Sequence, residues 1–367
     1  MRRQIFVVCL VSIAAMVASG VRAEVSIREL IDEAGLVEGP VAARDLKGWR
    51  KPEKMVVRDA LGIAERLQAV YPETKIIGVG TSAAAAAEAA GADAVIGFCS
   101  DHIVAAARDL VWVQIFGAGS ERCLAVDKVG NGDILLTNMQ KMSSPVIGEH
   151  AVAMMMSLAR GLVSYAKVMP SGAWERGLAR SGGTTTLAGK TVLVAGLGGI
   201  GTAVARRAHG LRMQVIATRN SSRVAPDFVD YVGLSGELLE LAARADVVVN
   251  ALPLTPKTTK LFNRAFFDAV KPGALFINVG RGGSVVTDEL VAALKDGRIG
   301  GAGLDVTEPE PLPADHELWQ MNNVIITPHV AASGGERDRY GVLVEENVRR
   351  FIAGDKLLNV VDPEKGY

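Results

Sequence analysis

Three chemically active side chains stand directly after apolar segments in the second half of the chain. Arg281 follows ALFINVG, Glu310 follows GLDVTEP, and His329 follows NVIITP. An arginine offers a planar fork of N–H donors that fits a carboxylate. A histidine titrates near neutral pH and suits general acid/base work, and a neighbouring carboxylate favours its protonated form and fixes its orientation. The three residues therefore predict a site that holds a small anion and moves a proton.

The elements that must position these residues are parallel strands. Ligands of open α/β sheets bind outside the carboxyl ends of the strands, which is where all three residues are expected. Apolar segments recur through this half of the chain, most with a helical pattern between them, as in a doubly wound sheet. The expected strands are TVLVA, MQVIAT, ADVVVNAL, GALFINVG, GGAGLDV and NVIITPH.

A glycine-rich stretch, GLGGIG, lies between the strand-like TVLVA and the helix-like TAVARRAHGL. In such a unit Gly196 permits a tight turn, Gly198 lets a pyrophosphate approach the backbone, and Gly201 lets the helix and strand pack closely. The free N–H groups at the helix start, which include those of Gly199 and Ile200, then face the phosphates. This context predicts a bound dinucleotide.

The next strand ends without the acid that usually holds a ribose 2′-hydroxyl. Thr218 and Arg219 stand in its place, with Arg223 close behind. A carboxylate there would repel a 2′-phosphate, whereas a hydroxyl and guanidinium groups suit one. We therefore predict a preference for NADP(H), with NAD(H) still possible. The alternative is that both arginines simply point into water.

Three further segments carry a resemblance: INVGRGGSVVTDELVAAL, GAGLDVTEPEPLP and NVIITPHVAA. With the glycine turn, their order and spacing resemble the D-isomer-specific 2-hydroxyacid dehydrogenase family, which includes glyoxylate/hydroxypyruvate reductases and phosphoglycerate dehydrogenases. The similarity runs from about residue 75 to 361 and is densest between 189 and 333. It implies that Arg281, Glu310 and His329 are catalytic. It also implies reduction of a small 2-keto acid, such as glyoxylate or hydroxypyruvate, to the D-2-hydroxy acid by hydride from a nicotinamide.

The resemblance implies softer roles for five other residues. Asp305 would face the nicotinamide amide, although a helix or turn contact is the alternative. Pro253 and Val279 would border the cofactor from loops at strand ends. In the segment FGAG, the backbone N–H groups of Ala118 and Gly119 would bind the substrate carboxylate together with Arg281, which requires small side chains.

Two domains are expected. The first, residues 24–145, would be a smaller flavodoxin-like α/β substrate domain, completed by residues 334–367. The second, residues 146–333, would be the NAD(P)-binding Rossmann domain with a long interdomain helix. The resemblance implies that the site lies in the cleft between them, where hinge closure excludes water, and that the enzyme is a homodimer.

Local patterns add detail to this outline. Residues 24–75 look helical and polar, and TSAAAAAEAAG is expected to be a short helix with Thr81 or Ser82 at its start. From Pro145 one long helix is predicted through GEHAVAMMMSLARGLVSYAK. We interpret Glu149 and His150 on this helix as structural.

The first 23 residues are of another kind. Arg2 and Arg3 precede the apolar run IFVVCLVSIAAMVASGV, and small residues flank Arg22. This pattern is typical of an export signal, here cleaved after Ala23, and it predicts a periplasmic or secreted protein with no membrane span after cleavage. The alternatives are an uncleaved membrane anchor and a mis-assigned start of a cytoplasmic enzyme. The paired arginines weakly resemble a twin-arginine signal.

Cysteine usage is sparse. Cys9 lies in the leader, which leaves Cys99 and Cys123 without metal-ligand spacing, so no metal site is predicted. A disulfide between them is possible, but we predict two free thiols.

Composition excludes some partners and leaves two other functions open. Forty basic residues balance forty acidic ones among 367, so no broad field attracts nucleic acid. One alternative is a corepressor-like binding protein of the same fold that senses dinucleotides. Another is a phosphoglycerate dehydrogenase-like enzyme that prefers NAD. Formate oxidation would need pocket signatures that we do not find in this sequence.

Overall fold

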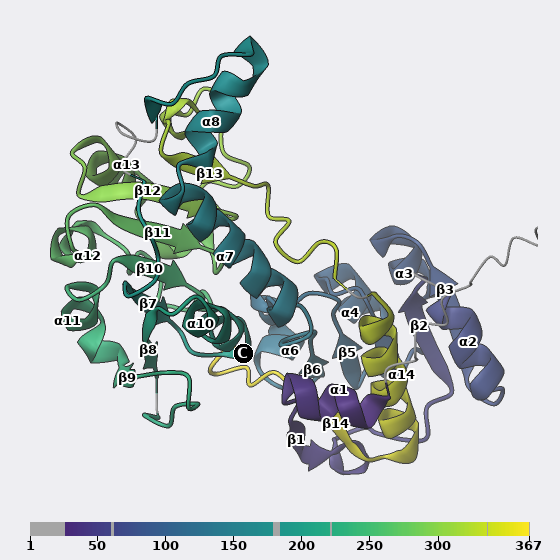
Figure 1. Cartoon of the computed structure of the whole chain (residues 1–367). Coiled ribbons are helices and arrows are strands. Elements are labelled where there is room, and N and C mark those ends of the chain that lie inside the picture. The colour runs from purple at the N-terminus through teal and green to yellow at the C-terminus, as the bar shows by residue number, and fades with distance from the viewer. Residues whose placement is uncertain (1–25, 60–61, 179–183, 221, 336, 367) are drawn as a thin grey trace, which may run out of the picture.

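The computed structural model describes residues 26–59, 62–178, 184–220, 222–335 and 337–366. These residues form two α/β units, each built on its own parallel sheet, with helix α7 (Ser144–Ala159) running between them (Figure 1). The predicted leader, residues 1–23, lies outside the described residues.

The first unit is built on five parallel strands in the order β3-β2-β4-β5-β6. Counted along the chain this is the order 2-1-3-4-5 of flavodoxin-like sheets. The strands are β2 (Lys54–Arg58), β3 (Lys75–Val79), β4 (Ala94–Ile96), β5 (Trp112–Gln114) and β6 (Leu135–Thr137). The helices are α1 (Ile27–Ala34), α2 (Ile63–Val70), α3 (Ser82–Glu88), α4 (Asp101–Ala106), α5 (Glu121–Leu124) and α6 (Asp127–Gly130).

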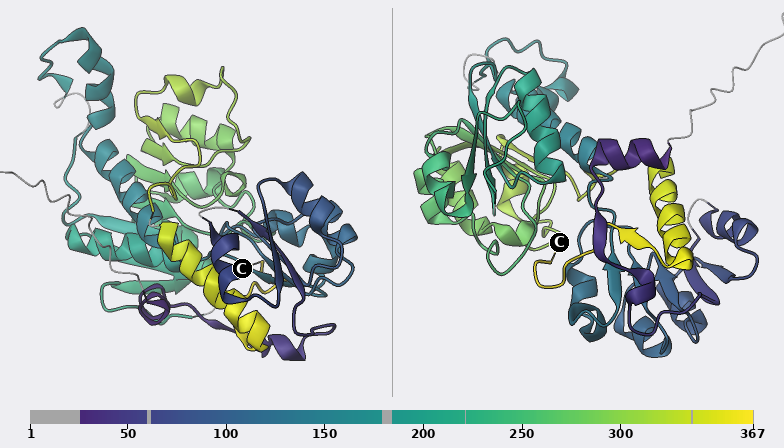
Figure 2. Two further views of the ribbon diagram at one scale, coloured as in Figure 1. Left: turned by 90° about the vertical axis from the view of Figure 1, so that its right-hand side faces the viewer. Right: turned by 90° about the horizontal axis from the view of Figure 1, so that it is seen from below.

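The end of the chain packs on this same sheet. Helix α14 (Arg337–Ala353) lies along the first unit in both views of Figure 2. Phe351 is buried and its ring centroid lies 5.0 Å from that of Trp112 on β5. Strand β14 (Lys356–Leu358) then pairs antiparallel with β1 (Glu38–Ala42).

The second unit is a seven-stranded parallel sheet in the order β13-β12-β11-β10-β7-β8-β9. The order reverses between β7 and β10, as in a Rossmann sheet, where dinucleotides bind at the reversal. The predicted α/β fold with a Rossmann unit and a smaller flavodoxin-like unit is confirmed. The strands are β7 (Thr191–Ala195), β8 (Gln214–Arg219), β9 (Tyr231–Leu234), β10 (Val247–Asn250), β11 (Ala274–Asn278), β12 (Ile299–Leu304) and β13 (Val324–Ile326).

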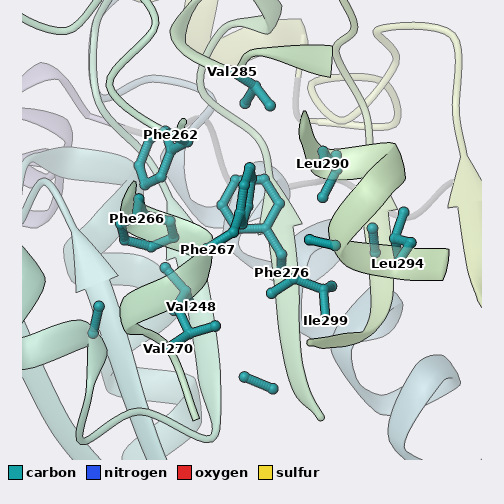
Figure 3. Packing of buried hydrophobic residues seen from close by; sticks show 14 of the residues in the cluster. Val248, Phe262, Phe266, Phe267, Val270, Phe276, Val285, Leu290, Leu294 and Ile299 are labelled. Atoms are coloured by element: carbon teal, nitrogen blue, oxygen red, sulfur yellow. The ribbon is translucent and has the colours of Figure 1, made fainter. Parts of the chain in front are cut away.

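Helices cover both faces of this sheet. Helices α7 and α10 (Gly199–Gly210) bury apolar side chains against one face. Helices α11 (Leu238–Ala242), α12 (Arg264–Ala269) and α13 (Thr287–Lys295) cover the other. There Phe262, Phe266 and Phe267 surround Phe276 of β11 with ring centroids 5.2–6.3 Å from its own (Figure 3). Aromatic pairs of this kind stabilise a fold by roughly 0.5–1.5 kcal/mol each beyond the effect of the buried area. They therefore hold β11 in place, and with it the residues that follow this strand.

The short 3-10 helices complete the chain. They are η1 (Ala43–Asp45), η2 (Met169–Ser171), η3 (Ser235–Glu237), η4 (Gly282–Ser284) and η5 (Glu317–Gln320).

Two predictions about local structure are wrong. Residues 24–75 are not mainly helical, because they include strand β2, which lies between β3 and β4 in the first sheet. Three residues of this strand, Met55, Val56 and Val57, are fully buried. The long helix from Pro145 breaks at Gly161, whose φ of +64° is left-handed. Helix α8 (Leu162–Val168) departs from there and projects from the body (Figures 1 and 2).

The break at Gly161 also matters for whether this region could cross a membrane. No single helix in the described ranges is long and apolar enough to cross a membrane. By length and composition alone, a bent pair passes that test: Ser144–Ala159 with Leu162–Ser171, at 72° to each other.

The prediction of two free thiols is also wrong, because Cys99 and Cys123 form a disulfide. Cys99 follows β4 and Cys123 lies in α5, and β4 and β5 are neighbours in the sheet. Segments that leave adjacent parallel strands emerge at the same edge, which brings the two Cα atoms to 5.6 Å, within the range of a disulfide. The bond fastens α5 to the loop after β4.

Candidate active site

His329 and Glu310 meet at the carboxyl edge of the second sheet. The imidazole Nδ1 lies 2.7 Å from Oε1 of Glu310, and we assign the proton to Nδ1 because a carboxylate accepts hydrogen bonds. Both side chains are about half exposed. Within the described residues, Nε2 of His329 makes no hydrogen bond, so this nitrogen can exchange a proton with a ligand.

The backbone at His329 adopts an unusual conformation that Asp305 holds in place. His329 has φ +54°, the left-handed region, which costs a non-glycine residue on the order of 1–3 kcal/mol. Its N–H donates to the carbonyl oxygen of Asp305 at 2.8 Å. The carboxylate of Asp305 accepts the N–H groups of Val330 at 2.9 Å and Ala331 at 3.1 Å.

The Asp305 carboxylate also has contacts within the protein itself. The residue is 3% exposed, and its carboxylate also accepts the Thr327 hydroxyl at 2.7 Å. The hydrogen bonds of this carboxylate within the described residues all go to the turn that carries His329, and the contact with the nicotinamide amide stays a prediction. Asp305 therefore positions the histidine.

His150 extends this network to the helix between the units. Its Nε2 lies 2.9 Å from the Thr327 hydroxyl oxygen and 3.7 Å from Oδ1 of Asp305. The histidine lies on α7, so the turn that carries His329 is tied to the helix that joins the two units. No spacing rule connects His150 with Thr327 in the sequence, so this contact could not be predicted.

Arg281 follows β11 and turns toward the first unit. Its Nε donates to Oε1 of Glu121 at 3.1 Å, and its Nη1 donates to the carbonyl of Gly280 at 2.8 Å. The structure does not bring Arg281 into contact with His329, because β12 lies between the strands that carry them. Glu121 was not predicted, since an acid beside an anion-binding arginine runs against the expected charge pattern.

The small-residue loop before α5 faces the same guanidinium. A Cβ at Gly119 would collide with Nη2 of Arg281, so a larger residue there would require the guanidinium to shift. The amide N–H groups of Ala118 and Gly119 donate no hydrogen bond to any part of the chain that the structure describes, whereas the Ala118 carbonyl accepts from Asn138 at 2.7 Å. Two free amides beside a guanidinium can bind a carboxylate.

The glycine turn fits a dinucleotide. Gly196 has φ +92°, and a Cβ at Gly201 would collide with the carbonyl oxygen of Gly196, so both positions require glycine. Helix α10 starts at Gly199 with no side-chain cap, which leaves its first N–H groups, including that of Ile200, for phosphates. The loops with Pro253 and Val279 follow β10 and β11 at the same edge of the sheet.

Two of the three residues proposed for the 2′-phosphate are engaged elsewhere. Thr218 is 4% exposed, and its hydroxyl accepts the Gly196 N–H at 3.2 Å, so it braces the turn and does not face a ligand. Arg223 is bound to Glu237, with Nη2 2.6 Å from Oε1. Arg223 and Tyr231 hold the pKa of Glu237 down at about 2. Arg219 remains at the turn, where its Nε donates to the Leu197 carbonyl at 3.2 Å.

In the described ranges no group of three or more His, Cys, Asp or Glu residues could hold a metal ion. A dinucleotide cradle and an acid/base pair at one sheet edge are what a nicotinamide-dependent oxidoreductase requires.

Comparison with known proteins identifies the family. The family model "D-isomer specific 2-hydroxyacid dehydrogenase, NAD binding domain" matches residues 152–331. A hydroxyphenylpyruvate reductase of Plectranthus scutellarioides is 33% identical over 315 residues, which cover 85% of this chain and 90% of that protein. An uncharacterized protein of Corynebacterium melassecola is 42% identical over 180 residues, 48% of this chain, and the chain spans only 59% of its length.

A solved structure agrees with these relatives. The NADPH-dependent glyoxylate/hydroxypyruvate reductase of Sinorhizobium meliloti, in complex with NADP and sulfate, superposes with a TM-score of 0.73 at 28% identity. The match covers 86% of this chain and all of that one. The chain belongs to the D-isomer specific 2-hydroxyacid dehydrogenase family. It is therefore an enzyme, an NAD(P)-dependent oxidoreductase that acts on CH–OH donors, as predicted.

Proposed function

We propose that the enzyme reduces a small 2-keto acid to the D-2-hydroxy acid with NADPH. The observation that carries this proposal is the His329–Glu310 pair, 2.7 Å apart, at the sheet edge where the glycine turn also lies. The guanidinium of Arg281 and the amides of Ala118 and Gly119 bind the substrate carboxylate. A bound nicotinamide supplies the hydride that reduces the keto carbon.

The proton comes from the histidine. In its protonated form His329 donates from Nε2 to the carbonyl oxygen, which becomes the new hydroxyl group. Glu310 accepts from Nδ1, so it orients the ring and stabilises the imidazolium before the transfer. The pair is about half exposed, so solvent can return the proton after product leaves.

The preference for NADP(H) has two supports. Thr218 replaces the usual acid at the end of β8, so no carboxylate at that position repels a 2′-phosphate. Arg219 lies against the glycine turn and offers a guanidinium to that phosphate. The Sinorhizobium meliloti relative is NADPH-dependent, which is in keeping with this assignment.

Substrate size separates the two named relatives, one acting on an aromatic keto acid and the other on glyoxylate or hydroxypyruvate. We favour the small substrates because Arg281 and Glu121 both lie against the Gly119 loop, close to where the substrate carboxylate would bind. The test is steady-state kinetics on glyoxylate, hydroxypyruvate and hydroxyphenylpyruvate with each cofactor. A higher kcat/KM for hydroxyphenylpyruvate, or equal use of NADH, contradicts the respective part of the proposal.

Export is a separate proposal. The leader pattern in residues 1–23 and the Cys99–Cys123 disulfide both favour an oxidising compartment, since structural disulfides persist outside the cytosol. Cell fractionation combined with a protease-accessibility assay on the full-length protein tests the proposal of export. A full-length protein found only in the cytosol, with both thiols titratable, contradicts it.

We also propose a homodimer that uses the projecting α8 segment. Three large apolar side chains are exposed on this one projecting segment, Trp174 at 86%, Met169 at 75% and Leu162 at 52%, and exposed apolar side chains that gather in one place mark interaction sites. Light scattering after size exclusion should give twice the chain mass for the wild type, and Trp174→Ser should weaken the association. A wild type that is monomeric at micromolar concentration contradicts the proposal.

A further inference from the structure

An ion pair joins the two units across the proposed substrate site. Glu121 is the first residue of α5 in the first unit, and Arg281 follows β11 in the second. Nε of Arg281 lies 3.1 Å from Oε1 of Glu121, and the side chains are 28% and 37% exposed. Arg281 is the same residue whose guanidinium must bind the substrate carboxylate.

Glu121 places a carboxylate of the protein where the carboxylate of the substrate is expected. An ideal Cβ on Gly119 would lie 2.7 Å from Oε2 of Glu121 and would collide with Nη2 of Arg281. Both charged groups therefore rest on the loop whose free amides face the ligand. A substrate carboxylate and Glu121 cannot use the same edge of one guanidinium at once.

The carboxylate is held there by a fastened helix. Cys123, two residues further on, is buried and disulfide-bonded to Cys99. Ser120, one residue before, is buried and donates its hydroxyl to the Gly366 carbonyl at 2.6 Å. Glu121 can change its rotamer, but its backbone stays beside Arg281.

We propose that Glu121 is an internal competitor that sets the affinity and charge specificity of the substrate site. Without substrate its carboxylate pairs with Arg281, and the carboxylate of a 2-keto acid displaces it. The displaced Glu121 stays next to the site, so a substrate with a second anionic group meets a like charge. This inference rests on the proposed function, since it assumes that Arg281 binds the substrate.

A role of Glu121 in orienting Arg281 predicts the opposite change in KM from a role as competitor. If Glu121 only oriented Arg281, its removal would misalign the guanidinium, and KM would rise while kcat fell. If Glu121 competes, Glu121→Gln keeps the shape and removes the charge, so KM falls. For a partly exposed ion pair we expect KM for glyoxylate to fall about two- to fivefold. For oxaloacetate, which carries two carboxylates, the fall should be larger.

The experiment compares wild type, Glu121→Gln and Asp127→Asn. Asp127 is an exposed carboxylate at the start of α6, six residues further along, so it controls for a general loss of negative charge. KM and kcat are measured for glyoxylate and oxaloacetate with NADPH, and thermal melting checks the fold. A lower KM in Glu121→Gln alone supports the proposal. A raised or unchanged KM in that variant overturns it.

A binding measurement separates this inference from the proposed function. Oxamate is an unreactive analogue of a 2-keto acid monoanion, and its Kd for the NADPH complex can be measured by calorimetry. If the wild type reduces no 2-keto acid, the proposed function fails. The inference then still stands if Glu121→Gln binds oxamate about two- to fivefold tighter than wild type, and it falls if binding is unchanged or weaker.

Discussion

Asp305 holds His329 from behind: its backbone carbonyl accepts the His329 N–H at 2.8 Å, while the histidine keeps φ +54°. The acid/base residue of the proposed mechanism is thus held in a left-handed conformation by a buried carboxyl residue of the neighbouring strand. A left-handed conformation of this kind persists only where surrounding contacts hold it. The hydrogen bonds of Asp305 are such contacts for the turn that carries His329.

We predict that Asp305→Asn lowers kcat more than it affects cofactor binding. An amide cannot accept from two N–H groups and a hydroxyl as a carboxylate does, so the turn loosens and His329 loses its position. Loss of these bonds should cost about 1–3 kcal/mol of stability and at least tenfold in kcat. The KM for NADPH should stay within about threefold, less than 1 kcal/mol.

The measurement is steady-state kinetics with urea denaturation, and Asp315→Asn serves as the control because Asp315 is exposed on the following loop. An Asp305→Asn variant with wild-type kcat would show that the turn does not need the carboxylate.

Arg219 should account for most of the cofactor preference. We predict that Arg219→Ala raises the KM for NADPH about tenfold or more, since hydrogen bonds to charged groups contribute roughly 1.5–3 kcal/mol. The KM for NADH should change little. Arg223→Ala should have the smaller effect, because Arg223 is already paired with Glu237. Equal losses for both variants would mean that Arg223 leaves Glu237 to bind the phosphate.

The Arg223–Glu237 pair should give a stability contribution that depends on pH. Hydrogen bonds from Arg223 and Tyr231 lower the pKa of Glu237 from 4.5 to about 2. A lowered folded-state pKa stabilises the fold above the ordinary value, and this contribution fades as pH falls from about 4.5 toward 2. Urea denaturation should therefore separate wild type from Glu237→Gln at pH 7 and bring them together near pH 2. A constant difference across that range would mean that the carboxylate charge is not involved.

The disulfide should stabilise the substrate loop. Replacing Cys99 and Cys123 by serine removes a link across 24 residues, which should cost about 3 kcal/mol of unfolding free energy. Because α5 directly follows the Gly119 loop, the KM for the 2-keto acid should change more than that for NADPH. Dithiothreitol should act on wild type in the same way, and the serine variant is its control. Unchanged stability in the double variant would mean that packing alone holds α5.

Local patterns in the sequence were enough to predict six of the seven strands of the second sheet and the residues at its edge, but not the edge strand β9 (Tyr231–Leu234). The glycine turn, Arg281 and His329 each follow a strand whose apolar residues are contiguous, so these strand ends could be placed from short windows. Glu310 follows β12, whose apolar residues are separated by glycines. The His329–Glu310 contact also follows, since the two residues are 19 positions apart on neighbouring strand ends.

Contacts between distant segments could not be predicted in this way. Glu121 meets Arg281 across 160 residues, and no spacing rule connects them. Strand β2 could not be predicted because its apolar run, Met55 to Val57, is only three residues long and lies between charged ones. The burial of Thr218 could not be predicted either, because the sequence does not distinguish a buried hydroxyl from an exposed one.

The central claim is that His329 and Arg281 perform catalysis on a substrate held beside a bound dinucleotide. The most direct test is glyoxylate reduction by His329→Gln and Arg281→Gln, with NADPH affinity measured on the same samples by fluorescence. The account predicts that kcat/KM falls at least a hundredfold in each variant, as expected when an acid/base group or charge-assisted binding is lost, while the Kd for NADPH stays near the wild-type value. Turnover within a few-fold of wild type in either variant, with cofactor bound normally, would contradict it.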